Sequence, residues 1–271
     1  MSRGAAEHEV AYDLWSRLHG GLDPRGSFWV SGWVRLTHAG ARPLARVGVH
    51  PDAVTLAGVL LTATVPLVAA LGGIWPLVAV VPLVVAAVLD GVDGALAAQT
   101  GTASARGRVL DALADRCSDL LLVLTLLVLG APGWLVAALA VATLLLEYAR
   151  SVAQAAGMPG AGAVTVWERP SRVIVTSFAA ASCAAESVAR SAGVDVLPAV
   201  DADVLALVGA AVGLALALAA GAQLTRGVAR DLPRGPVAQA QAGGPTSPAT
   251  MPAESSTSGS PPPGWDDPPT R

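Results

Sequence analysis

Four aspartates interrupt two otherwise apolar stretches of the sequence. Asp90 and Asp93 lie near the end of one stretch, and Asp111 and Asp115 lie near the start of the next. An ionised aspartate in the middle of a membrane helix costs roughly 2.5–3.5 kcal/mol on insertion scales, so such residues need a compensating partner. The apolar run 75–89 rises roughly 22 Å as a helix. The first pair is therefore expected near one edge of the membrane.

The spacing of the four aspartates indicates what that partner is. Asp90 and Asp93 are three residues apart and Asp111 and Asp115 are four apart, so each pair shares one face of a helix. The two helices are consecutive and antiparallel, and both pairs lie near the loop that joins them. Four converging carboxylates repel each other, and hard divalent cations relieve that repulsion. The sequence therefore predicts a Mg²⁺ or Mn²⁺ site.

Small residues border the acidic pairs and leave room beside them. Gly94, Ala95 and Ala97 have small side chains or none, so a flat ligand or a phosphate can approach the backbone of this helix. Gly107 follows in the next helix. Gly91 is explained equally well by close packing between helices.

The composition is that of a membrane protein. The chain of 271 residues is 53% hydrophobic and only 14% charged, whereas soluble domains carry roughly 25% charged residues. The small net charge of -3 argues against nucleic acid as a partner. Residues 1–23 lack the apolar core of a signal peptide, so we expect the first membrane helix to direct insertion.

Six apolar segments have the length of membrane-spanning helices, which need about 20 residues each. Segments of this kind must be helical in lipid, because a helix satisfies its backbone polar groups internally. The predicted fold is an all-α integral membrane protein with six transmembrane helices, at about 53–72, 76–97, 109–130, 133–155, 170–189 and 203–224.

Arginines mark one side of the membrane. They cluster before the first predicted span, after the second, after the fourth and after the sixth, whereas the alternate loops carry one arginine in all. By the positive-inside rule, both termini and the acidic site face the cytoplasm. We expect a multi-pass protein of the plasma membrane.

The spans define four regions of the chain. Residues 1–27 form a polar segment, and residues 28–48 alternate large apolar groups with arginine, as in an amphipathic helix at the membrane interface. Residues 49–231 hold the six spans. Residues 232–271 are rich in Pro, Ser and Gly and are expected to be disordered.

The acidic segment resembles a known signature. The letters DGVDGALA at 90–97, followed by Gly107, Asp111 and Asp115, are similar to the pattern D-x2-D-G-x2-A-R…G-x3-D-x3-D of the CDP-alcohol phosphatidyltransferase family. The wider resemblance covers about 42–224. One position departs, because the arginine of the pattern is Ala98 here. Arg106 and Arg108 in the following loop are the candidates to replace it.

The resemblance implies a role for each group of residues. Two metal ions would be bound by the four aspartates, and Asp115, with Asp111 beside it, would provide the catalytic carboxylates, Asp115 being the general base. Asp52, Thr55, Gly94, Ala97, Gly107 and Arg108 would bind the CDP donor. Arg150, Arg169 and Arg172 would bind an acceptor phosphate. Glu147 and Tyr148 are taken as interface residues outside the site.

The resemblance also implies the reaction. A phosphatidyl group would pass from a CDP-activated lipid, such as CDP-diacylglycerol, to an alcohol or polyol phosphate, with release of CMP, in phospholipid biosynthesis. Membrane lipids would surround the protein, and a homodimer is expected because family members commonly form dimers.

Three alternatives compete with this interpretation. A membrane prenyltransferase also binds Mg²⁺ and diphosphate through aspartates, but in two separated motifs rather than around one loop. A six-helix transporter would place its acids near the midplane, on broken helices. A catalytically weak or inactive relative is suggested by Ala98.

Overall fold

The structure, a computed structural model of the whole chain, divides into two units, residues 1–233 and 234–271. It describes residues 9–13, 15–16, 23–158, 164–194 and 200–232. Nearly all of the predicted tail 232–271, and much of the polar segment 1–27, lie outside the described residues.

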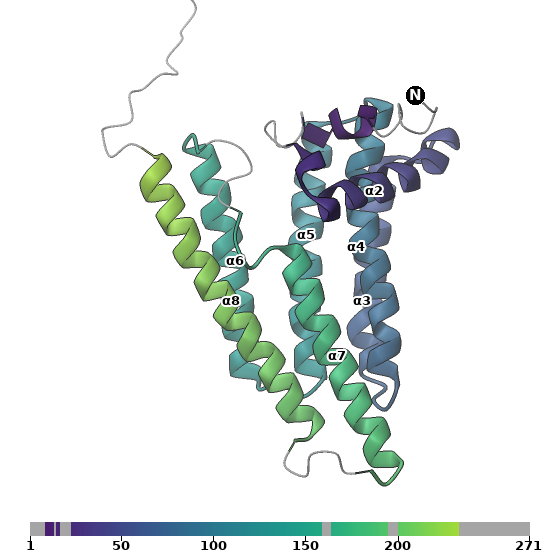
Figure 1. Cartoon of the computed structure of the whole chain (residues 1–271), viewed down its shortest axis with the longest axis vertical. Helices are drawn as coiled ribbons and strands as arrows, with labels where there is room; N and C mark the ends of the chain where they lie inside the picture. Colours follow the sequence, from purple (N-terminus) through teal and green to yellow (C-terminus); the bar gives the residue numbers. More distant parts are fainter. Residues whose placement is uncertain (1–8, 14, 17–22, 159–163, 195–199, 233–271) are drawn as a thin grey trace, which may run out of the picture. The chain divides into compact units, whose positions relative to one another are not determined.

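Long helices make up the first unit (Figure 1). A short 3-10 helix, η1, precedes them. The elements are η1 (Pro24–Gly26), α2 (Phe28–Arg46), α3 (Pro51–Ala69), α4 (Trp75–Thr100), α5 (Ala105–Val128), α6 (Gly133–Ala155), α7 (Arg169–Ser191) and α8 (Ala202–Asp231).

Each of the six expected spans is a single helix, α3 to α8. Five of these helices, all except α5, are long and apolar enough to cross a membrane. Helix α5 has 24 residues, but its first four turns carry both acidic and basic side chains. The protein is therefore an all-helical, multi-pass membrane protein.

Some helix ends differ from the predicted ones. The last expected span ended at 224, whereas α8 continues to Asp231, because hydropathy reports contact with lipid and a helix can run on into water. Helix α4 continues past 97 to Thr100 and ends where Gly101 adopts φ 67°, a left-handed conformation suited to glycine.

A tight connection joins the two acidic helices. After Gly101, only three residues precede α5. Ser104 caps α5, because its hydroxyl accepts a hydrogen bond from the Gly107 N–H at 3.0 Å. The C-terminal end of α4 and the N-terminal end of α5 therefore lie at the same end of the bundle.

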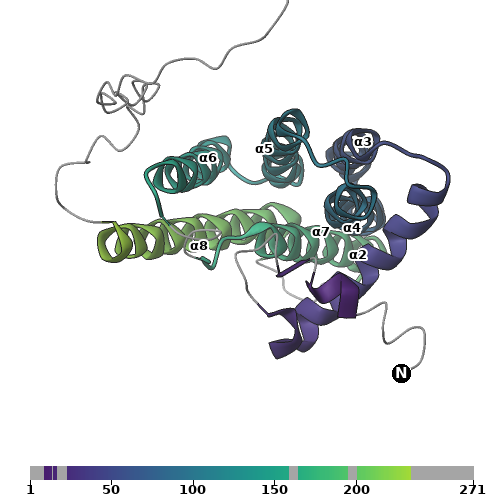
Figure 2. The same ribbon diagram turned by 90° about the horizontal axis from the view of Figure 1, so that it is seen from above.

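Helix α4 lies among three others. It packs against α3, α2 and α7, and α5 in turn packs against α3, α6 and α7 (Figure 2). The core between these helices is apolar, with Leu83, Leu126 and Leu139 almost fully buried. Figure 1 shows α2 lying across the bundle helices rather than alongside them.

Gly91 allows α2 to approach α4 closely. A Cβ atom at position 91 would lie 2.5 Å from Thr37 Cγ2 and 3.1 Å from the Trp33 ring, both on α2. At Gly94, one turn further along α4, no atom lies within 4 Å of such a Cβ. The packing explanation of Gly91 therefore agrees with the contacts, and Gly94 faces open space.

We predict that Gly91→Ala lowers the Tm of the purified protein in detergent, because overpacking costs about 1–3 kcal/mol. Gly94→Ala is the matched control, since it adds the same methyl group to the same helix without a clash. The measurement is thermal unfolding of both variants and the parent. Equal Tm values for the two variants would show that α2 does not pack on α4 in this way.

Candidate functional site

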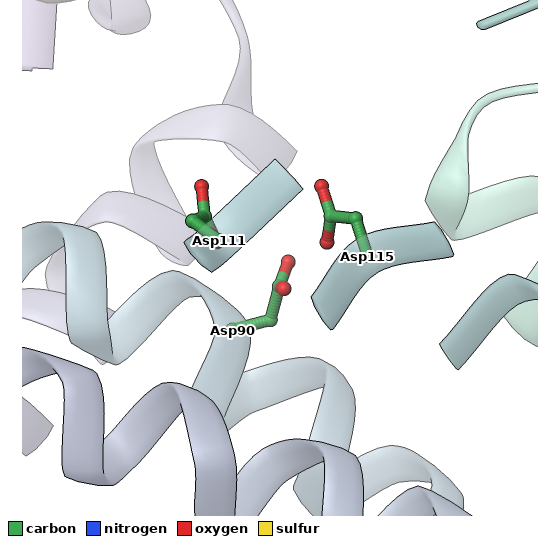
Figure 3. Close-up of side chains that lie close together, drawn as sticks. All are labelled: Asp90, Asp111 and Asp115. Atoms are coloured by element: carbon green, nitrogen blue, oxygen red, sulfur yellow. The ribbon is translucent and has the colours of Figure 1, made fainter. Parts of the chain in front are cut away.

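Three of the four predicted metal ligands meet where α4 faces α5. Asp90, Asp111 and Asp115 each offer a carboxylate oxygen, and these oxygens lie within 4.8 Å of one another (Figure 3). Asp90 and Asp115 are partly buried and Asp111 is exposed. The cluster is thus partly buried at Asp90 and Asp115 and open to its surroundings at Asp111, which we call its open rim.

Asp93 is placed differently from the other three. It is 5% exposed, and the Thr55 hydroxyl of α3 donates a hydrogen bond to its Oδ2 at 2.5 Å. The Gly94 N–H donates to its Oδ1 at 2.6 Å. Asp93 therefore stands beside the three-carboxylate group and is oriented by α3.

Arg169, the first residue of α7, lies at the acidic cluster. Its Nη1 is 3.0 Å from Asp90 Oδ1 and is also ion-paired with Asp115. The Arg169 side chain is 22% exposed, so it is accessible from the open rim. The sequence assigned Arg169 to an acceptor phosphate, and the structure places it directly beside the carboxylates.

The six residues assigned to the donor lie together. They line one cavity of about 240 Å³, which we call the motif cavity, between the N-terminal end of α3 and the loop joining α4 to α5. Asp93, Ala98 and Asp111 line it as well. The donor-assigned residues are Asp52, Thr55, Gly94, Ala97, Gly107 and Arg108.

Arg172 lies deeper in the bundle than the other arginines of the predicted site. It is 4% exposed, and its Nη1 donates to Asp119 Oδ2 at 2.7 Å. It is also ion-paired with Glu147 and donates to the Trp167 carbonyl at 2.9 Å. The guanidinium of Arg172 therefore joins α5, α6 and α7 by buried charge pairs.

Three members of this network were missed in the sequence. Glu147 was set aside as an interface residue, and Asp119 and Arg116 were not singled out. Arg116 is 3.1 Å from Glu147 Oε2 and 3.4 Å from Asp119 Oδ2. The four-residue step that links Asp111 to Asp115 continues to Asp119, and this periodicity was the signal that could have identified it.

Arg150 is paired with the residue that precedes α7. Its two terminal nitrogens donate to the Glu168 carboxylate at 2.8 and 2.6 Å, and Nη2 also donates to the Thr165 hydroxyl at 3.1 Å. Burial raises the pKa of Glu168, but hydrogen bonds from Arg150 and Thr165 outweigh it, and the pKa lies below its ordinary value. This pairing ties α6 to the start of α7.

The oxygen atoms of the aspartate cluster are suited to a hard divalent cation. All the ligand atoms are carboxylate oxygens, which Mg²⁺ and Mn²⁺ prefer. Two of the carboxylates lie one turn apart on α5 and the third comes from α4, so two consecutive helices contribute to the cluster. Arg169 supplies positive charge beside it, as expected for acids at the edge of a membrane bundle.

Comparison with known proteins matches most of the described chain to a family. Residues 48–218 match the family model described as CDP-alcohol phosphatidyltransferase. The chain is 36% identical over 151 residues to a phosphatidylinositol phosphate synthase of Mycobacterium marinum, covering 53% of this chain and 63% of that protein. It is 33% identical over 139 residues to an archaetidylinositol phosphate synthase of Pyrococcus horikoshii, covering 51% of this chain and 72% of that protein.

The fold has counterparts among solved structures. The phosphatidylinositol phosphate synthase of Mycobacterium tuberculosis, in complex with manganese and citrate, superposes with a TM-score of 0.57 at 24% identity. The alignment covers 72% of this chain and 89% of that one. The same enzyme with CDP-DAG bound gives a TM-score of 0.54. The family model matches more than half of the chain, and the chain therefore belongs to the CDP-alcohol phosphatidyltransferase family.

Proposed function

We propose that this protein transfers a phosphatidyl group from a CDP-activated lipid to the hydroxyl of a polyol phosphate and releases CMP. The observation that carries the proposal is the juxtaposition of two sites. The cluster of Asp90, Asp111 and Asp115 carboxylates lies next to the motif cavity, because Asp111 belongs to both. Metal-binding groups beside an open cavity are what a diphosphate donor requires.

The membrane arrangement we propose has six spans. Helix α5 lies between two apolar helices along the chain and packs against four others, and its 24 residues rise roughly 36 Å. Asp115, Arg116 and Asp119 of its charged half pair with arginines or carboxylates of the bundle, which is where intramembrane charges are tolerated. The arginine distribution supports a cytoplasmic position for both termini and the site, and we propose the plasma membrane as the location.

The exposed side chains of α2 support a position for this helix at the membrane interface. Phe28 and Trp29 are 77% and 83% exposed, and Trp33 and Leu36 are also exposed. Val34, on another face of the helix, is buried. Exposed aromatic and aliphatic side chains on one helix are suited to the headgroup region. We propose that α2 lies there, with its apolar face in the lipid.

The donor would lie in the motif cavity, with its lipid tails in the bilayer. Thr55 orients Asp93, and the open space beside Gly94 leaves room for the nucleotide. Asp90, Asp93, Asp111 and Asp115 would hold two divalent ions, which would supply the positive charge that neutralises a diphosphate and favours CMP as the leaving group.

The chemical step needs a base near the acceptor. Asp115 takes the proton from the acceptor hydroxyl, with Asp111 one turn away on the same helix. The acceptor oxygen forms a bond to the phosphorus that carries the lipid. The bond from this phosphorus to the CMP oxygen breaks at the same centre.

Arg169 is the arginine best placed for an acceptor phosphate. It is accessible and touches Asp115, so a phosphate bound there would hold its hydroxyl near the base. Arg172 and Arg150 are engaged with Asp119, Glu147 and Glu168. We assign these two a positioning role, through the orientation of α7, instead of the direct phosphate contact implied by the sequence.

The relatives point to the kind of acceptor. Two of them are named as inositol phosphate lipid synthases from a bacterium and an archaeon. We therefore propose an inositol phosphate as the first acceptor to test, ahead of glycerol phosphate or serine. A weakly active or inactive member is the second candidate, favoured by Ala98 alone, and a homodimer is the expected assembly.

We predict metal-dependent CMP release from CDP-diacylglycerol by the purified protein, with inositol phosphate as the best acceptor of a panel. Asp111→Asn should lower the rate about 100-fold or more, which corresponds to roughly 2.7 kcal/mol of transition-state stabilisation. Asp231→Asn changes an exposed carboxylate at the end of α8 and is the control. Normal turnover by the Asp111 variant would rule out the proposed metal site.

The Arg150–Glu168 pair predicts a pH-dependent stability. Because the folded-state pKa of Glu168 is depressed, the pair stabilises the fold fully above the ordinary glutamate pKa. This stabilisation is lost as the pH falls through the folded value. We expect Glu168→Gln to lower the Tm by roughly 2–4 °C near neutral pH. The Tm of this variant should also fall less than that of the parent when the pH is lowered. Thermal unfolding from pH 3 to 7 measures this, and parallel curves for variant and parent would contradict it.

A further inference from the structure

Position 98 is where this chain departs from its family signature. Ala98 lies on α4 and lines the motif cavity together with Asp93 and Gly94. The family arginine at this position would bring a positive charge to the wall of that cavity. An alanine brings none, so a diphosphate held there needs a cation from another element.

Arg108 supplies a cation at the opposite wall of the same cavity. It lies three residues before Asp111, so both side chains lie on one face of α5. Asp111 also lines the cavity. Arg106 lies two residues before Arg108, so helical geometry turns its side chain to another face of α5. It does not border the cavity.

The Arg108 guanidinium is also uncommitted. It is exposed, and no residue in the described ranges forms an ion pair or a side-chain hydrogen bond with it. Arg169 contacts Asp90 and Asp115, where we assign it to the acceptor, and Arg172 is ion-paired with Asp119. An exposed arginine without a partner at the rim of an acid-lined cavity is suited to an anionic ligand.

We propose that Arg108 replaces the missing motif arginine from the facing helix and binds the diphosphate of the CDP donor. The inference rests on the proposed function and defines how this chain binds its donor. The small side chain of Ala98 leaves open the space on α4 that an arginine would occupy. In this proposal the positive charge at the motif cavity comes from α5 instead of α4.

The test is a charge-relocation cycle. Arg108→Ala should raise the KM for CDP-diacylglycerol roughly 10- to 100-fold, the range expected for hydrogen bonds to a charged group, and leave the acceptor KM unchanged. Adding Ala98→Arg to this variant should recover most of the loss. Arg106→Ala is the matched control, because it removes the same charge from the same helix turn outside the cavity.

A binding measurement separates the diphosphate from the nucleoside. Titration with CDP should show the same 10- to 100-fold loss for Arg108→Ala, and titration with cytidine should show none. Arg108→Lys, which keeps the charge, should retain part of the CDP affinity. If the wild type releases CMP and Arg108→Ala matches it in donor KM and CDP affinity, the role of Arg108 is refuted and the proposed function stands.

Two other results would also overturn the inference. Equal losses with Arg106→Ala would mean that general positive charge, and not Arg108, attracts the donor. If the double variant Arg108→Ala/Ala98→Arg has the same raised donor KM as Arg108→Ala alone, position 98 does not border the diphosphate. A wild type without metal-dependent CMP release would remove the proposed function itself, and the inference with it.

Discussion

Carboxylates inside a bundle of membrane helices are stable only when opposite charge lies beside them, and this requirement organises the structure. Asp90, Asp111 and Asp115 converge at one end of α4 and α5, and Arg169 of α7 meets them there. Below this level, Asp119 and Glu147 meet Arg172 and Arg116. Paired charges therefore join α4, α5 and α7 in the first group, where Asp111 is exposed, and α5, α6 and α7 in the second, more deeply buried group.

The same arrangement explains how a reaction at a membrane surface can be supported. An apolar core fixes the helices through residues such as Leu83 and Leu139, and the charged layer sits where the bundle opens. The motif cavity faces the loop between α4 and α5, so a lipid can keep its tails in the bilayer while its polar group reaches the carboxylates. Arg169 of α7 contacts two of these carboxylates, Asp90 and Asp115.

Much of this was predictable from the sequence, and the reasons for the failures are physical. Apolar runs of about 20 residues predicted six helices, because a helix satisfies its backbone polar groups within a single segment. Helix ends were misplaced where polar turns continue, as at Asp231. The meeting of Asp90, Asp111 and Asp115 followed from helical periodicity. The hydrogen bond from Thr55 that orients Asp93, and the partnership of Glu147 with Arg172, join distant segments and required the tertiary structure.

The direct test of the central claim is to locate the cation. Crystals of the protein grown with Mn²⁺ can be measured at the manganese absorption edge, where anomalous density marks the ion itself. The account predicts density in contact with the carboxylates of Asp90, Asp111 and Asp115, with Asp93 at its border. Saturating Mn²⁺ that leaves no density there, or density bound by other residues, would contradict the claim that these aspartates form the metal site.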